Sequence, residues 1–109
     1  MIRPGFGAID QARITTAVSE LARNIYLYAG KGVVRVRTVQ DAANTWGIEV
    51  VCVDRGPGIP DVAAAMRDGY STSSGMGMGL PGAKRLVDEF DLQTEIGSGT
   101  TVVIRKWRK

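Results

Sequence analysis

The stretch Asp54-Arg55-Gly56-Pro57-Gly58-Ile59 decides the fold when it is taken together with two others. Further along the chain lies Gly75-Met76-Gly77-Met78-Gly79-Leu80, and upstream of both lies Glu20-Leu21-Ala22-Arg23-Asn24. Each stretch alone is compatible with an ordinary turn or a solvated helix face. In this order, an acid and an amide one helical turn apart precede two glycine-rich segments. The combination predicts a nucleotide site built from one helix and two loops.

The composition indicates one globular domain over residues 1–109, with 44% hydrophobic and 23% charged residues. No apolar run approaches the ~20 residues of a membrane span, and no signal segment opens the chain, so we expect a cytoplasmic protein. The chain has no histidine, which excludes a phospho-acceptor histidine and histidine metal sites. Net charge is +3, but the basic end 106–109 is a poor nucleic-acid footprint, and an acidic protein partner fits better. Cys52 is expected to be a buried thiol.

The hydrophobic pattern predicts the order helix, two strands, short helix, loop, helix, two strands. Asp10 is a plausible helix cap and Gly30 a plausible helix end. This order predicts an α+β sandwich with helices on one face of a mixed sheet. Helices are expected at 10–28, 62–68 and 80–90, a half-buried strand at 33–39, a central strand at 48–53, and a hairpin of strands at 92–96 and 100–107.

Glu20 and Asn24 lie one turn apart on the first expected helix, at the border of its apolar stripe. An amide oxygen is a suitable ligand for Mg²⁺, which takes one or two protein groups together with phosphates and water. A neighbouring carboxylate can accept a proton from an attacking hydroxyl. Taken alone, the pair is also compatible with a solvated helix face.

Asp54 directly follows the expected central strand, with Gly56 and Gly58 after it. A carboxylate at a strand end can accept a hydrogen bond from the exocyclic amine of a purine. Glycines allow backbone to approach a flat base because they carry no Cβ. The alternative is a plain β-turn, which Arg-Gly-Pro-Gly would form in any protein.

Gly75, Gly77 and Gly79 precede the third expected helix, and their N–H groups with the helix N-terminus suit a di- or triphosphate. The segment follows a loop, whereas the dinucleotide fingerprint follows the first strand of a βαβ unit, so that fingerprint is not indicated. No Gly-x4-Gly-Lys-Ser/Thr occurs, so a P-loop is excluded. We expect the serine- and glycine-rich residues 70–78 to form a lid over the ligand.

The three motifs resemble the N, G1 and G2 boxes of the Bergerat ATP-binding fold of the gyrase, Hsp90, histidine kinase and MutL superfamily. Gly97-Ser98-Gly99-Thr100 resembles its closing Gly-Thr element. The resemblance implies ATP and Mg²⁺ as cofactors, Asn24 as the Mg²⁺ ligand and Glu20 as general base. It further implies that Asp54 binds the adenine amine with support from Thr100. The implied ATP-binding residues are Asn24, Asp54, Gly56, Gly58, Gly75, Gly77, Gly79, Leu80 and Thr100.

Residues 19–32, 69–75 and 79–90 more closely resemble the serine/threonine switch kinases of the bacterial stressosome, the RsbT-like family, over about residues 8–109. This resemblance implies phosphorylation of STAS-domain scaffold or antagonist proteins and activation of a PP2C-type phosphatase. Anti-sigma-factor kinases share the fold. Family members carry a further strand and helix before the first motif, and this chain begins almost at that motif. We therefore expect a sandwich that lacks this strand and helix and has an exposed apolar flank.

The favoured interpretation is an ATP-dependent protein serine/threonine kinase of partner switching. One alternative is a non-catalytic anti-sigma or partner-binding module whose conformation nucleotide sets. Glu20 favours the kinase, because binding alone needs no base there. The other alternative is the ATPase half of a histidine kinase. The short segment between Asp54 and Gly75, and the lack of a dimerisation helix, count against it. The substrate protein, the acceptor residue and the oligomeric state do not follow from the sequence.

Overall fold

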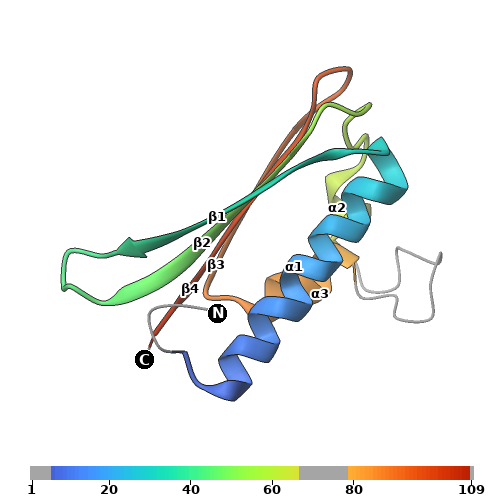
Figure 1. Ribbon diagram of the computed structural model, residues 1–109. Coiled ribbons are helices and arrows are strands. Elements are labelled where there is room, and N and C mark those ends of the chain that lie inside the picture. Colours follow the sequence, from blue (N-terminus) through green and yellow to red (C-terminus); the bar gives the residue numbers. More distant parts are fainter. Residues whose placement is uncertain (1–5, 67–78, 109) are drawn as a thin grey trace.

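The computed structural model describes residues 6–66 and 79–108 as a sheet covered on one face by helices (Figure 1). No helix in this described part of the chain is long and apolar enough to cross a membrane. The helices are α1 (Ala8–Ala29), α2 (Val62–Ala65) and α3 (Gly79–Leu86), and the strands are β1 (Gly32–Gln40), β2 (Trp46–Asp54), β3 (Glu89–Glu95) and β4 (Gly99–Trp107).

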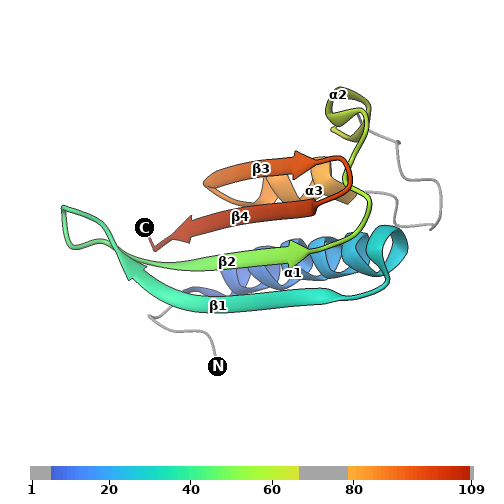
Figure 2. The same cartoon turned by 90° about the horizontal axis from the view of Figure 1, so that it is seen from above.

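The sheet has the strand order β1-β2-β4-β3, and every neighbouring pair is antiparallel (Figure 2). The α+β architecture with helices on one face is as expected, but the expectation of a mixed sheet is wrong for the described strands. The reason lies in the crossover between β2 and β3. These two strands run in the same direction, and β4 lies between them and opposes both. The helical connection from β2 to β3 therefore joins two strands that run in the same direction but are not adjacent in the sheet.

The core lies between α1, α3 and the helix-facing side of the sheet. Leu21 and Val50 are each only 1% exposed, which places the apolar stripe of α1 directly on the central strand β2. Cys52 is buried in the same cluster, as expected, and burial raises the pKa of its thiol to about 11. Burial of this stripe against the sheet is the main apolar stabilisation of the fold.

Helix ends differ from the expected ones at two places. Gly7, and not Asp10, occupies the N-cap of α1, while Asp10 lies in the first turn, where an acidic side chain favours the helix dipole. Gly30 ends α1 as expected, with a positive φ of 82° and its N–H donating to the Ile25 carbonyl oxygen. Helix α3 stops at Leu86 and Phe90 lies in β3, because Phe90 pairs with Ile104 on β4. Helix α2 begins at Val62 as expected, and residues 67 and 68 of its expected span lie outside the described residues.

Strand β1 is an exposed edge strand, which corrects the expectation that it is half-buried. Val34 and Val36 pair with the buried residues Cys52 and Val50, so they point toward the helix layer. They are nevertheless 39% and 56% exposed, because α1 packs mainly over the neighbouring strands. An apolar flank of the kind expected from the sequence is therefore present on the helix side of β1.

Candidate nucleotide site

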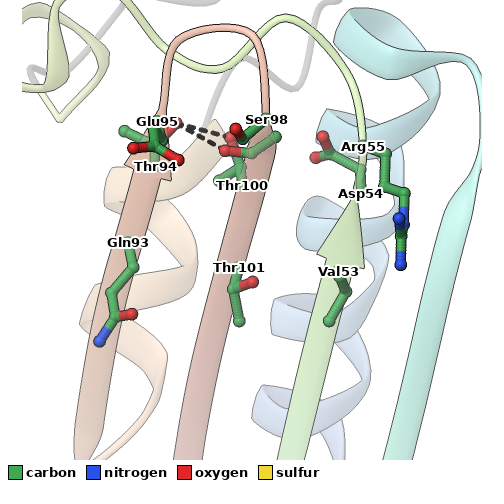
Figure 3. Close-up of a pocket in the computed structure, with 10 residues that line it drawn as sticks. Val53, Asp54, Arg55, Gln93, Thr94, Glu95, Ser98, Thr100 and Thr101 are labelled. Carbon is green, nitrogen blue, oxygen red and sulfur yellow. Dashed lines mark hydrogen bonds between the residues drawn. The ribbon is translucent and has the colours of Figure 1, made fainter.

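Three polar side chains form one row across the ends of three adjacent strands (Figure 3). Asp54 on β2 pairs with Thr100 on β4, and Thr100 pairs with Thr94 on β3. Side chains alternate between the faces of a strand, so Asp54 and Thr100 share the helix-facing side with the buried core. They are 8% and 6% exposed. The structure thus places two predicted nucleotide-binding residues side by side.

Thr94 is a member of this row that the sequence analysis missed. Its hydroxyl lies 2.8 Å from the Thr100 hydroxyl and accepts a hydrogen bond of 2.9 Å from the Ile59 backbone N–H. It therefore links the loop after Asp54 to the β3–β4 hairpin. The signal was present in the sequence, because a hairpin that turns around Gly97-Ser98 places the residues at 94 and 100 opposite each other.

Asp54 is a buried carboxylate that accepts few hydrogen bonds from the described part of the protein. Its Oδ1 accepts a hydrogen bond of 2.9 Å from the Gly56 N–H, a local turn that fixes the side chain. Within the described residues, no lysine or arginine forms an ion pair with it. An ionised carboxylate has about four acceptor positions. Asp54 therefore retains capacity to accept hydrogen bonds from a ligand.

The glycines after Asp54 serve close packing within the protein. Gly58 has a φ of 82°, and a Cβ there would lie 2.5 Å from the Glu95 carbonyl oxygen. A Cβ on Gly56 would lie 2.6 Å from the Cβ of Ala29 at the end of α1. Approach to a flat base was the predicted role of these glycines. The structure adds that they bring the loop against both α1 and the hairpin, which assembles the site.

Glu20 and Asn24 occupy successive turns of α1, as predicted. Glu20 is 8% exposed, which is more buried than a border position suggests, and Asn24 is half-buried. The last turn of α1 contacts the loop after Asp54 through Ala29 and Gly56. Helix α1, which carries Glu20 and Asn24, therefore packs by its last turn against the loop that follows Asp54.

The second glycine-rich segment is only partly described. Gly75 and Gly77, with most of the expected lid, lie outside the described residues, and Gly79 begins α3. Leu80 is 3% exposed and belongs to the core. Its backbone N–H lies in the first turn of α3, where it is available to an anion.

A hollow of about 420 Å³ lies at the strand ends. Its lining includes Asp54, Thr94 and Thr100, together with residues of the opposite sheet face such as Val53 and Thr101. Neither Glu20 nor Asn24 lines it. The hollow thus covers the strand-end part of the candidate site only. The described residues contain no group of three or more acidic, histidine or cysteine side chains suited to hold a metal. A metal bound near Asn24 would take its other ligands from phosphates and water.

Residues 9–109 match the family described as histidine kinase-, DNA gyrase B-, and HSP90-like ATPase. The chain is 57% identical over 103 residues to the serine/threonine-protein kinase RsbT of Bacillus subtilis, covering 94% of this chain and 77% of that protein. It is 30% identical over 99 residues to the anti-sigma F factor of Caldanaerobacter subterraneus subsp. tengcongensis, covering 88% of this chain and 69% of that protein.

Solved structures share the fold. A mycobacterial sensor histidine kinase, MprB, matches with a TM-score of 0.60 and 25% identity, over 89% of this chain and 72% of that one. Full-length ShkA, solved in complex with AMPPNP, matches with a TM-score of 0.62 and 22% identity over 89% of this chain. The present chain spans only 22% of ShkA. The chain therefore belongs to the histidine kinase-, DNA gyrase B- and HSP90-like ATPase family, and within it to the group of the serine/threonine-protein kinase RsbT.

Proposed function

We propose that this chain is an ATP-dependent protein serine/threonine kinase of a bacterial partner-switching pathway. The observation that carries the proposal is the buried carboxylate of Glu20, one helical turn from the amide of Asn24. The identity to a named serine/threonine-protein kinase supports the same function.

The residues present fit ATP and Mg²⁺. Asp54 is a buried acceptor that forms no ion pair among the described residues, which suits the neutral amine of adenine. Thr100 and Thr94 hold this end of the site through their paired hydroxyls. The amide oxygen of Asn24 is a suitable Mg²⁺ ligand, and the ion would neutralise charge on the transferring phosphoryl group.

Phosphoryl transfer depends mainly on positioning and electrostatics. In the proposed step, Glu20 accepts the proton of a serine or threonine hydroxyl while that oxygen attacks the γ-phosphorus. The new oxygen–phosphorus bond forms as the bond from the γ-phosphorus to the β–γ bridging oxygen breaks, and ADP leaves. Asn24 and Asp54 hold the two ends of the nucleotide, which fixes the line of attack.

The proposed substrates are STAS-domain scaffold or antagonist proteins of the stressosome, and the proposed location is the cytoplasm. After release from its substrate, the kinase would bind and activate a PP2C-type phosphatase. A positively charged domain, with a net charge of +3, is suited to acidic protein partners.

Replacement of Glu20 tests the catalytic role. Glu20→Gln should lower phosphoryl transfer from labelled ATP to a STAS-domain protein by ~10²–10⁴-fold, the range for loss of a general base. ATP affinity should change little, because a base acts in the transition state. Undiminished transfer by the variant would exclude this role of Glu20.

Replacement of Asn24 tests the metal. Asn24→Ala should weaken ATP binding in the presence of Mg²⁺ by about tenfold, the effect of one lost ligand or charged hydrogen bond. Binding measured by calorimetry with EDTA should be equal for the two proteins, which serves as the internal control. An equal loss with and without the metal would contradict the assignment.

A non-catalytic anti-sigma or partner-binding module is the second candidate, and the 30% identity to an anti-sigma F factor favours it. The same variant separates the two functions. If the chain only binds its partner, Glu20→Gln should leave the affinity for that partner unchanged. The native protein should then transfer no label from ATP to the partner.

A further inference from the structure

The hydroxyl of Thr94 has three hydrogen-bond partners within the described residues. The Ile59 backbone N–H lies 2.9 Å from its oxygen, the Gly99 carbonyl oxygen 3.2 Å, and the Thr100 hydroxyl oxygen 2.8 Å. A hydroxyl has one proton to donate and two lone pairs that accept. Three partners therefore use all of its capacity, and the direction of each bond follows from what each partner can do.

The partners leave one consistent set of directions. The N–H of Ile59 only donates, so it occupies one lone pair of Thr94. The carbonyl oxygen of Gly99 only accepts, so it takes the proton of Thr94. The bond to Thr100 must then use the remaining lone pair, which makes Thr100 the donor. The proton of Thr100 therefore points toward Thr94 and away from Asp54.

The reverse direction between the two threonines forms fewer hydrogen bonds. If Thr94 donated to Thr100, the Gly99 carbonyl oxygen would lose its bond from Thr94. The proton of Thr100 would also lack an acceptor, because among the described residues no hydrogen bond joins Thr100 to Asp54. Thr100 is only 6% exposed, and an unmade hydrogen bond at a buried group is unfavourable. The first set of directions is therefore the stable one.

This direction fixes what Thr100 offers to a ligand. With its proton held by Thr94, the Thr100 oxygen presents lone pairs alone, and it lies beside Asp54 in the row of Figure 3. The ionised carboxylate of Asp54 likewise only accepts. Two adjacent acceptors suit the 6-amino group of adenine, which has two N–H bonds. They oppose a 6-oxo group, whose oxygen is itself an acceptor.

We infer that Thr94 is a positioning residue for base selectivity. It holds the Thr100 hydroxyl as an acceptor, and the site thereby prefers 6-aminopurine over 6-oxopurine nucleotides. The inference rests on the proposed function, since it takes the row of Asp54, Thr100 and Thr94 as the place where the base binds. Its effect on selectivity is distinct from the link that Thr94 makes between the hairpin and the loop after Asp54.

A comparison of ATP with ITP tests the inference. ITP carries a 6-oxo group and a protonated N1 where ATP has the 6-amino group and a bare N1. Thr94→Val keeps the branched shape and removes the hydroxyl, so the Thr100 proton turns to Asp54 or to the ligand. Either outcome removes an acceptor from the site. The ratio of ITP to ATP dissociation constants, measured by calorimetry with Mg²⁺, should fall roughly tenfold, the effect of one hydrogen bond.

The ratio separates selectivity from a loss of structure. A loop that is merely less well held should weaken both nucleotides alike and leave the ratio unchanged. Thr94→Ser keeps the hydroxyl and should retain the native ratio, whereas Thr94→Ala is a second variant without it and should lower the ratio as Thr94→Val does. Thr38→Val makes the same change at an exposed position of β1, opposite Ile48 and far from Asp54, and should have no effect.

A double substitution tests whether Thr94 acts through Thr100. Thr100→Val removes the hydroxyl that Thr94 orients, so adding Thr94→Val to that chain should not change the ratio further. A further fall of the same size would overturn the inference, as would a native ratio that both Thr94→Val and Thr94→Ala retain. In either case, ATP binding by the native protein would leave the proposed function standing. A native protein that binds no nucleotide would overturn the proposed function and this inference with it.

Discussion

Asp54 and Glu49 are both buried carboxylates on strand β2, five residues apart, yet their surroundings are opposite. Glu49 points to the sheet face opposite the helices and is enclosed by the guanidinium groups of Arg37 and Arg105. These hydrogen bonds, that of Arg37 foremost, hold the pKa of Glu49 below its usual value. Asp54 points to the helix side and, among the described residues, accepts only from the neutral N–H of Gly56.

The difference separates a structural acid from a binding acid. A buried carboxylate with two cationic partners is satisfied by the fold itself and has little left to offer a ligand. A buried carboxylate with one neutral donor is costly to the fold unless a further donor arrives. The same side-chain chemistry on one strand thus serves stability at one end and recognition at the other. Each of the following substitutions is expected to affect mainly ligand binding or mainly stability.

Asp54→Asn should have the largest effect, a loss of ATP affinity of about a hundredfold, because a charge-assisted acceptor is replaced by an amide. Thermal stability should fall little, since the Gly56 N–H keeps an oxygen acceptor. Discrimination between ATP and GTP should also decrease. Titration of both nucleotides by calorimetry measures these effects. Similar affinity of the unaltered protein for GTP and ATP would remove the basis of the assignment.

Glu49→Gln should act in the opposite way, on stability and not on binding. Loss of the charged hydrogen bonds should lower the free energy of unfolding by about 2 kcal/mol, a decrease in Tm of roughly 8–16 °C for a domain of this size. The arginines stay partly exposed, which limits the loss. Scanning calorimetry gives the stability, and ATP affinity of the folded variant is the control. A variant as stable as the native protein would contradict the structural role.

The pH dependence of stability tests the structural role of Glu49 further. Because its folded pKa is lowered, Glu49 stabilises the native state fully above its unfolded value near 4.5, and this contribution is lost as pH falls through the folded pKa. Urea midpoints of the native protein should therefore decrease on acidification more than those of Glu49→Gln. The two curves should converge at low pH. Parallel curves down to the acid limit would exclude Glu49 as a source of the dependence.

Thr94→Ala should have the smallest effect, about 1 kcal/mol, from the loss of its hydrogen bonds to Thr100 and Ile59. ATP affinity should fall several-fold because the loop after Asp54 is less well held. Exchange protection of the Ile59 amide should decrease in the same variant. Thr94→Ser keeps the hydroxyl and is the matched control. Unchanged protection at Ile59 would contradict the linking role.

The sequence was sufficient for most elements and for two of the three side chains in the row at the strand ends, Asp54 and Thr100. Apolar spacing located α1, and the strand-end position of Asp54 with the Gly-Thr element near Thr100 located two partners that the structure brings together. Patterns of this kind report local geometry directly, since a strand alternates and a helix repeats.

The misses share a cause, which is dependence on residues distant in the chain. The antiparallel sheet follows from insertion of β4 between β2 and β3, and the exposure of β1 follows from where α1 packs. In the sequence, Glu49 is a single acid in an apolar strand. Only the strand register shows that Arg37 and Arg105 lie beside it. Thr94 likewise gains its role only from its hairpin partner and from the loop that docks on it.

Cys52 gives the molecule a built-in reporter of its own opening. With a thiol pKa of about 11, at pH 8 only about one molecule in a thousand carries the reactive thiolate, and Cys52 is only 2% exposed. An alkylating reagent therefore modifies the folded chain only when the sheet and α1 separate. Since the sequence has a single cysteine, every labelled molecule records one such event. The rate of labelling then measures how often the core opens, without any engineered probe.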